Sequence, residues 1–111
     1  FSNNTSLITI PPLDCSSLTQ TEWMGGLVIN KLTNVGGFLN LKTSCTRNGF
    51  DKTPNLTYES CINILNGLYD FTGNGETPTS SQGQLKVHSN FLDLVGDEIS
   101  IATNKGWQIL A

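Results

Sequence analysis

The chain has 111 residues, of which 37% are hydrophobic and 14% are charged, and its formal net charge is −3 at pH 7. This length accommodates one domain at most, and the six Lys and Arg residues form no basic run that could neutralise nucleic-acid phosphates. No apolar run approaches the ~20 residues that span a bilayer. We therefore expect neither a nucleic-acid partner nor a membrane span.

The N-terminal third predicts short strands separated by turns. Residues Leu7–Ile10 alternate apolar and polar side chains, which is typical of a strand, and Pro11 and Pro12 would then stop its pairing. The aliphatic run Leu27–Ile29 predicts a second strand. The apolar residues between these two runs follow no helical or strand period, so we expect irregular backbone there.

Glycines and polar residues divide the middle of the chain. Gly36 and Gly37 permit a positive φ between apolar segments, and the segment that starts at Leu39 predicts another strand. The run Thr43–Asn55 has no apolar period and contains Asn-Gly and Pro turn signals. We expect this run to be a surface loop that can vary without disturbing the core.

The clearest predicted helix begins after Thr57. The hydroxyl of Thr57 can accept a hydrogen bond from a first-turn amide, and Glu59 suits the positive end of the helix dipole. Gly73 is available to end this helix. Apolar residues recur three or four positions apart and predict one buried face, made of Tyr58, Cys61, Leu65 and Leu68.

The last third predicts a loop, a strand, a second helix and a final strand. Small polar residues, glycine and proline fill Thr72–Gln84 and leave almost nothing to bury, which indicates a mobile loop. A strand is expected from Leu85, and Asp97 is expected to cap the second helix. Gly106 then closes this helix, and Trp107 begins the final strand.

The three cysteines, Cys15, Cys45 and Cys61, lie far apart in the sequence and form no C-x-x-C pair. This spacing argues against a zinc site and against a disulfide framework. We interpret the three residues as small buried hydrophobes. Three cysteines can form at most one internal disulfide and leave at least one free thiol. The cysteines therefore barely constrain the redox compartment of the protein.

Two polar motifs are candidate chemical sites. His88, the sole histidine, has no Ser, Asp or Cys partner at a recognisable spacing, so a capping or solvent-facing role is favoured over catalysis or metal binding. The segment Asp70–Glu76 begins like a calcium loop, but Ser81 stands where a bidentate glutamate should close the site. A polar loop is the better interpretation. We predict no catalytic residue, cofactor or metal ligand.

Four aromatic residues could form a platform that stacks sugars: Trp23, Tyr58, Tyr69 and Trp107. The two tyrosines fall on the apolar face of the predicted helix and Trp107 falls in the last strand, so core packing is favoured for these three. Trp23 lies on no predicted element. It is the candidate ligand contact.

The segment Leu85–Leu110 reads as a strand, a helix and a second strand, with strand starts about 24 residues apart. This spacing is typical of a leucine-rich repeat. We therefore predict an α/β fold: one leucine-rich-repeat-like, right-handed solenoid domain over residues 1–111, with short parallel strands and helices on the outer face. Because the chain starts at Phe1 without a methionine, we also expect it to be the C-terminal part of a longer chain.

Three blocks carry a family resemblance: Leu32–Phe38 (LTNVGGF), Leu56–Gly73 (LTYESCINILNGLYDFTG) and Glu98–Trp107 (EISIATNKGW). They resemble the C-terminal end of BspA-like leucine-rich-repeat proteins. The resemblance implies a surface protein of gut or oral bacteria, or a tail or fibre protein of their phages, with no catalytic residues. It also implies structural roles in the ladder, helix core and terminal cap for Leu39, Leu41, Leu65, Leu68, Leu85, Val87, Gly106 and Trp107.

The leading expectation for function is non-enzymatic recognition of a protein or glycan on a cell surface, by a bacterial adhesin or by the host-recognition domain of a phage tail. The alternative is a purely structural part of a virion or surface assembly, without a ligand of its own. Both place the chain outside the cell, on a cell surface or in a virion. The strand edge near Phe1–Ile10 is expected to be covered by upstream repeats, another domain or another subunit.

Overall fold

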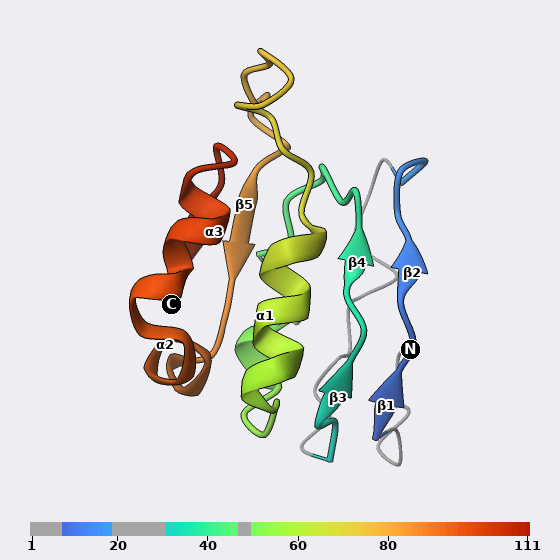
Figure 1. Cartoon of the computed structure of the whole chain (residues 1–111), viewed down its shortest axis with the longest axis vertical. Coiled ribbons are helices and arrows are strands. Elements are labelled where there is room, and N and C mark those ends of the chain that lie inside the picture. Colours follow the sequence, from blue (N-terminus) through green and yellow to red (C-terminus); the bar gives the residue numbers. More distant parts are fainter. Residues whose placement is uncertain (1–7, 19–30, 47–49) are drawn as a thin grey trace.

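A computed structural model describes residues 8–18, 31–46 and 50–111 of the chain. Short strands β1 to β4 come first in the chain, and short helices with strands β5 and β6 follow (Figure 1). In chain order the elements are β1 (Thr9–Ile10), β2 (Leu13–Asp14), β3 (Asn34–Val35), β4 (Phe38–Leu39), the 3-10 helix η2 (Phe50–Lys52), α1 (Tyr58–Gly67), β5 (Gln84–Lys86), α2 (Ser89–Val95), the 3-10 helix η3 (Gly96–Ile99), α3 (Ser100–Thr103) and β6 (Gln108–Leu110).

The strands pair in parallel, two at a time. Strand β1 pairs with β3, β2 with β4, and β5 with β6. Helix α1 contacts β3 and β4, and it also contacts α2 and α3, so it lies between the N-terminal strands and the C-terminal helices (Figure 1). The buried side chains of these elements form one hydrophobic cluster.

The predicted leucine-rich-repeat-like solenoid, with its outer helices and C-terminal cap, is wrong. The described strands form three separate two-stranded parallel sheets, whereas a solenoid would stack them in a continuous ladder. The radius of gyration is 12.8 Å, close to the ~13 Å of a compact domain of 100 residues. The chain is a small compact α/β structure.

Prolines and glycines interrupt the N-terminal strands. Pro11 and Pro12 end β1, as the sequence predicted, but β2 follows at Leu13–Asp14, where irregular backbone was expected. Gly36 and Gly37 separate β3 from β4. Gly37 has the predicted positive φ, at 111°. Two-residue strands result on both sides of each break, so each strand contributes little pairing of its own.

Helix α1 begins where the sequence predicted and ends earlier. The hydroxyl of Thr57, the N-cap residue, accepts the Ser60 N–H at 3.1 Å. The helix ends at Gly67, however, and Leu68 is extended, so the predicted continuation to Gly73 is wrong. A Cβ on Gly67 would lie 3.3 Å from the carbonyl oxygen of Phe38. Glycine therefore allows the end of the helix to approach β4 closely.

The C-terminal helical region begins earlier than predicted. His88 is the N-cap residue of α2, and its Nδ1 atom accepts the Asn90 N–H at 3.0 Å. The capping role favoured for His88 is thus confirmed. Asp97 lies inside η3, so its predicted role as a helix N-cap is wrong. Gly96 has a φ of 53° and separates α2 from the rest of the region.

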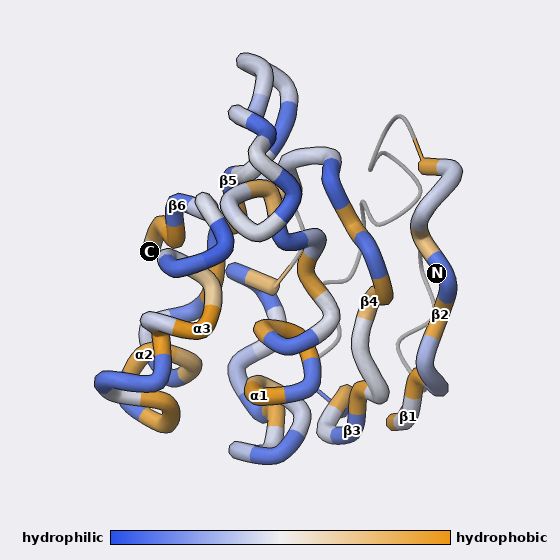
Figure 2. Tube along the Cα trace, turned by 45° about the horizontal axis from the view of Figure 1, so that its top comes forward, coloured by the Kyte–Doolittle hydropathy of each residue, from blue (hydrophilic) through white to orange (hydrophobic). Residues whose placement is uncertain are grey.

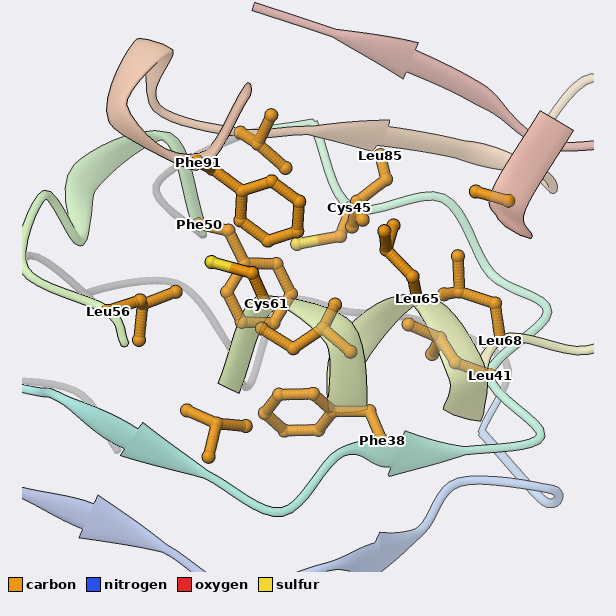
Figure 3. Close-up of a cluster of buried hydrophobic side chains, with 14 of the residues drawn as sticks. Phe38, Leu41, Cys45, Phe50, Leu56, Cys61, Leu65, Leu68, Leu85 and Phe91 are labelled. Carbon is orange, nitrogen blue, oxygen red and sulfur yellow. The ribbon is translucent and has the colours of Figure 1, made fainter. Parts of the chain in front are cut away.

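The core includes a residue from the segment predicted to be a surface loop. Phe50 has no exposed surface, and its ring lies 5.2 Å from the ring of Phe38. Figure 3 shows it inside the buried cluster together with Cys61 and Phe91. Thr53 is buried as well, and its hydroxyl donates to the carbonyl of Phe50. The expectation that Thr43–Asn55 can vary without disturbing the core is wrong.

Two apolar residues with predicted structural roles point outward: Leu39, for which the resemblance implies a ladder role, and Tyr58, which is predicted to pack in the core. Leu39 is 39% exposed because alternation along β4 places Phe38 inside, and Tyr58 is 45% exposed. The hydroxyl of Tyr58 hydrogen-bonds the carboxylate of Glu98. Trp107 is buried as predicted, and its indole N–H donates to the carbonyl of Tyr69 at 2.9 Å.

Part of the segment between α1 and β5 projects from the body of the molecule, and this projecting part is hydrophilic to neutral (Figure 2). Asp70 orders the start of this segment, since its carboxylate accepts the Gly73 N–H at 2.8 Å. Within the described residues, no helix is long and apolar enough to cross a membrane.

Candidate functional site: a groove beside helix α1

A hollow with a volume of about 310 Å³ opens between the first turns of α1 and the two turns that interrupt the N-terminal strands. We call it the α1 groove. Its volume lies at the lower end of the range for small-ligand sites. It is lined by Thr9, Ile10, Pro11, Pro12, Asn34, Val35, Gly36, Thr57, Glu59, Ser60 and Asn63.

Side chains of α1 fix strand β3 as one wall of the groove. The buried hydroxyl of Ser60 accepts the Val35 N–H at 2.8 Å and donates to the carbonyl of Thr33 at 2.9 Å. The side-chain amide of Asn63 donates to the carbonyl of Val35 at 3.0 Å. The Thr57 N–H also donates to the carbonyl of Thr33. Helix side chains therefore replace a strand partner along this edge of β3.

Replacing Ser60 by alanine should lower the free energy of unfolding by about 1–3 kcal/mol, because the buried Val35 N–H would lose its acceptor. Urea unfolding monitored by circular dichroism measures this change. The exposed Ser100 provides a matched control, for which the same substitution should cost much less. Equal losses for the two variants would contradict the assigned role of Ser60.

The opposite wall comes from the turn between β1 and β2, which packs tightly against the turn between β3 and β4. A Cβ on Gly36 would lie only 2.4 Å from Cδ of Pro12. Ile10 and Val35 are buried and form an apolar floor, whereas Pro11 and Pro12 remain exposed. The groove thus has an apolar base between two walls of defined geometry.

The rim of the groove is polar and contains a single ionisable side chain among the described residues. Glu59 is the one titratable residue among the described lining residues. Asn34 and Thr9 are exposed, and Asn63 is half-buried. These groups can donate and accept hydrogen bonds, and no nucleophile is paired with a base among them. The arrangement suits binding better than turnover.

A second hollow, of about 400 Å³, lies between the segment that precedes α1 and helix α2. It is lined by Pro54, Asn55, Leu56, Asn90, Asp93 and Leu94. The side-chain amide of Asn90 donates to the carbonyl of Pro54, and Leu94 is 44% exposed. This hollow is the more open of the two. We therefore take the α1 groove as the candidate site.

The three thiols are poorly placed for chemistry. Cys15, Cys45 and Cys61 are free and buried, as predicted. Burial raises the pKa of Cys45 to about 11 and that of Cys61 to about 11, and it also raises the pKa of Cys15. The thiolate is the reactive form of cysteine, so these groups are inert near neutral pH.

The raised thiol pKa values predict a loss of stability at alkaline pH. A thiol with a folded pKa of about 11 and an ordinary pKa of 9.0 loses its proton first in the unfolded chain. The free energy of unfolding should therefore fall as the pH rises from about 9 to about 11. Urea unfolding across this range measures the slope. The slope should be shallower in a Cys45→Ala, Cys61→Ala double variant, and an unchanged slope would contradict this assignment.

The other residues named from the sequence do not meet at one site. Trp23, the candidate ligand contact, lies outside the described residues. In the loop that resembles the start of a calcium site, the carboxylate of Asp70 is engaged by the Gly73 N–H. Residues 8–18, 31–46 and 50–111 contain no cluster of three or more His, Cys, Asp or Glu side chains that could hold a metal ion.

Sequence reasoning missed most of the groove. The sequence pattern assigns Glu59 to the helix dipole alone and predicts no role for Asn34, Ser60 and Asn63. The groove is lined by three segments that are distant in the sequence, so no local motif predicts it. The one available signal was a serine on the buried side of an amphipathic helix, because a buried hydroxyl requires partners.

Within the described residues, these features define a small compact α/β protein with a groove that has an apolar floor and a polar rim, and with buried thiols. No family model, curated protein or solved structure matches the chain.

Proposed function

We propose that this chain is a non-enzymatic recognition module that binds a protein or glycan on a cell surface through the α1 groove. The groove carries the proposal because it combines an apolar floor, a hydrogen-bonding rim and walls held by the buried Ser60 network. Binding sites typically combine apolar surface with a few well-placed polar groups.

The state of the reactive side chains supports a non-enzymatic role. The thiols are buried with raised pKa values. Nδ1 of His88 accepts a backbone N–H at the start of α2. The ammonium group of Lys105 donates to three main-chain carbonyls. Each of these groups has a structural environment that accounts for it.

The resemblance of three sequence blocks to BspA-like surface proteins supports a location outside the cell. We accordingly place the module on a bacterial surface or in the tail of a phage, as an adhesin or host-recognition domain. The solenoid that the resemblance implied is not part of this proposal. Trp23 stays a candidate contact, because ligand-contacting aromatics supply large contact area at low entropic cost.

Binding of the labelled 111-residue chain to arrays of peptides and glycans tests the proposal. A reproducible hit that is lost in an Asn34→Trp variant would support it, since this substitution places a large side chain on the rim of the groove. A hit that survives Asn34→Trp would contradict the assignment of the site. Turnover of an array compound would contradict the non-enzymatic class.

A structural role in a virion or surface assembly is the second candidate. Within the described residues, β1 pairs with β3 alone and β2 with β4 alone, and Ile8 beside β1 is 54% exposed. Edge strands of this kind are available for pairing with another chain. Light scattering at several concentrations tests this candidate. A defined oligomer together with blank arrays would favour it, and a monomer would disfavour it.

A further inference from the structure

We infer that the α1 groove binds a basic peptide segment, with an arginine or lysine side chain directed at Glu59. The inference rests on the proposed function, and it narrows the ligand from a protein or glycan to a peptide of positive charge.

Charge complementarity favours a cationic occupant. Glu59 is the one ionisable side chain among the described lining residues, and it is exposed. The whole chain also carries a net charge of −3 at pH 7. A phosphate or carboxylate ligand would meet repulsion at this carboxylate, whereas a guanidinium or ammonium group would be attracted. Arginine can in addition bind a carboxylate through two parallel hydrogen bonds.

The apolar lining of the groove suits the methylene stem of an arginine or lysine side chain. The exposed rings of Pro11 and Pro12 provide apolar surface in the groove that Glu59 also lines, over the buried Ile10 and Val35. Arginine and lysine bury their methylene stems along apolar surface while the charged group stays hydrated. One residue of the ligand can therefore contact both the proline rings and the carboxylate.

The amide side chains favour a peptide over a sugar. The NH2 group of Asn63 donates to the carbonyl of Val35, and the side-chain oxygen of this lining residue can accept a ligand N–H. Asn34 is exposed and carries both a donor and acceptors. A peptide backbone presents complementary N–H and C=O groups. Sugar sites commonly use an aromatic platform, and the described lining residues include no aromatic side chain.

Two matched probes test the inference on the whole chain: acetyl-Ala-Arg-Ala-amide and acetyl-Ala-citrulline-Ala-amide. Citrulline keeps the shape of arginine and removes its charge. In a titration followed by 15N–1H correlation spectra, the arginine peptide should shift the amide signals of Asn34, Glu59 and Asn63. The citrulline peptide should bind about twofold to fivefold more weakly, the range that exposed ion pairs contribute.

Glu59→Gln should abolish the difference between the two peptides, and the matched variant Asp97→Asn, at an exposed site outside the groove, should preserve it. Equal affinity of the two peptides for the wild-type chain would overturn the inference, as would shifts confined to other residues or no shifts with either peptide. In each of these cases, a glycan hit on the array that is lost in Asn34→Trp would leave the proposed function standing.

Discussion

Replacing Phe50 by alanine is expected to lower the free energy of unfolding by about 3–5 kcal/mol, the range for truncating a buried phenylalanine. The ring of Phe50 has no exposed surface and contacts that of Phe38 at a centroid distance of 5.2 Å. It also belongs to the same buried cluster as Leu85 and Phe91. Truncation would leave a cavity inside this cluster, beside Phe38 of β4, and short elements have little capacity to close it.

Urea unfolding monitored by circular dichroism measures this loss. Leu39→Ala is the matched control, since Leu39 is also a large apolar residue but is 39% exposed in β4. Its cost should be about 1 kcal/mol or less. If Phe50→Ala costs no more than Leu39→Ala, the segment around Phe50 lies on the surface and the core described above is incorrect.

Lys105→Met should lower the free energy of unfolding by about 2–3 kcal/mol, because it removes a charged cap from the C-terminus of α1. The ammonium group donates to the carbonyls of Leu65, Asn66 and Leu68 at 3.1, 2.7 and 3.1 Å. These carbonyls include acceptors that a helix end leaves without partners. Burial lowers the pKa of Lys105, while the charge of Asp70 acts in the opposite direction.

Lys31→Met controls for the loss of a positive charge, since Lys31 is exposed. This control should change the free energy of unfolding by about 0.5 kcal/mol or less. Amide hydrogen exchange adds a local readout, because the last turn of α1 should exchange faster in Lys105→Met alone. Equal stability of the two variants would contradict the capping role of Lys105.

The sequence predicted the features that depend on adjacent residues. The hydroxyl of Thr57 caps α1 because the acceptor and the Ser60 amide lie three positions apart. The positive φ of Gly37 and the strand break at Pro11 and Pro12 likewise depend on local backbone geometry. Capping and turn preferences act over a few residues, so a single sequence can reveal them.

The features that the sequence did not reveal depend on residues far apart in the chain. Ser60 bonds the amide of Val35 across 25 positions, and Lys105 bonds the carbonyl of Leu65 across 40 positions. Phe50 lies in a polar segment, so periodicity gave no reason to bury it. The α1 groove depends on the same kind of long-range contact, which is why Glu59 was recognised only as a favourable charge at a helix start.

The solenoid prediction failed for a related reason. The spacing between Leu85 and Ile109 does correspond to a parallel pair, in which these two residues are direct partners. However, a single strand–helix–strand unit can form such a parallel pair without further repeats. The spacing therefore indicated that two strands are parallel neighbours and did not establish that every strand joins one stack.

The most direct test of the groove as a recognition site compares two blocking variants in the same array experiment. Asn34→Trp adds a bulky side chain at the rim of the α1 groove, and Leu94→Trp adds one in the second, more open hollow. We predict that Asn34→Trp alone loses binding of the peptide or glycan, while circular dichroism shows that both variants are folded. Loss in Leu94→Trp alone, or retention in both variants, would contradict it.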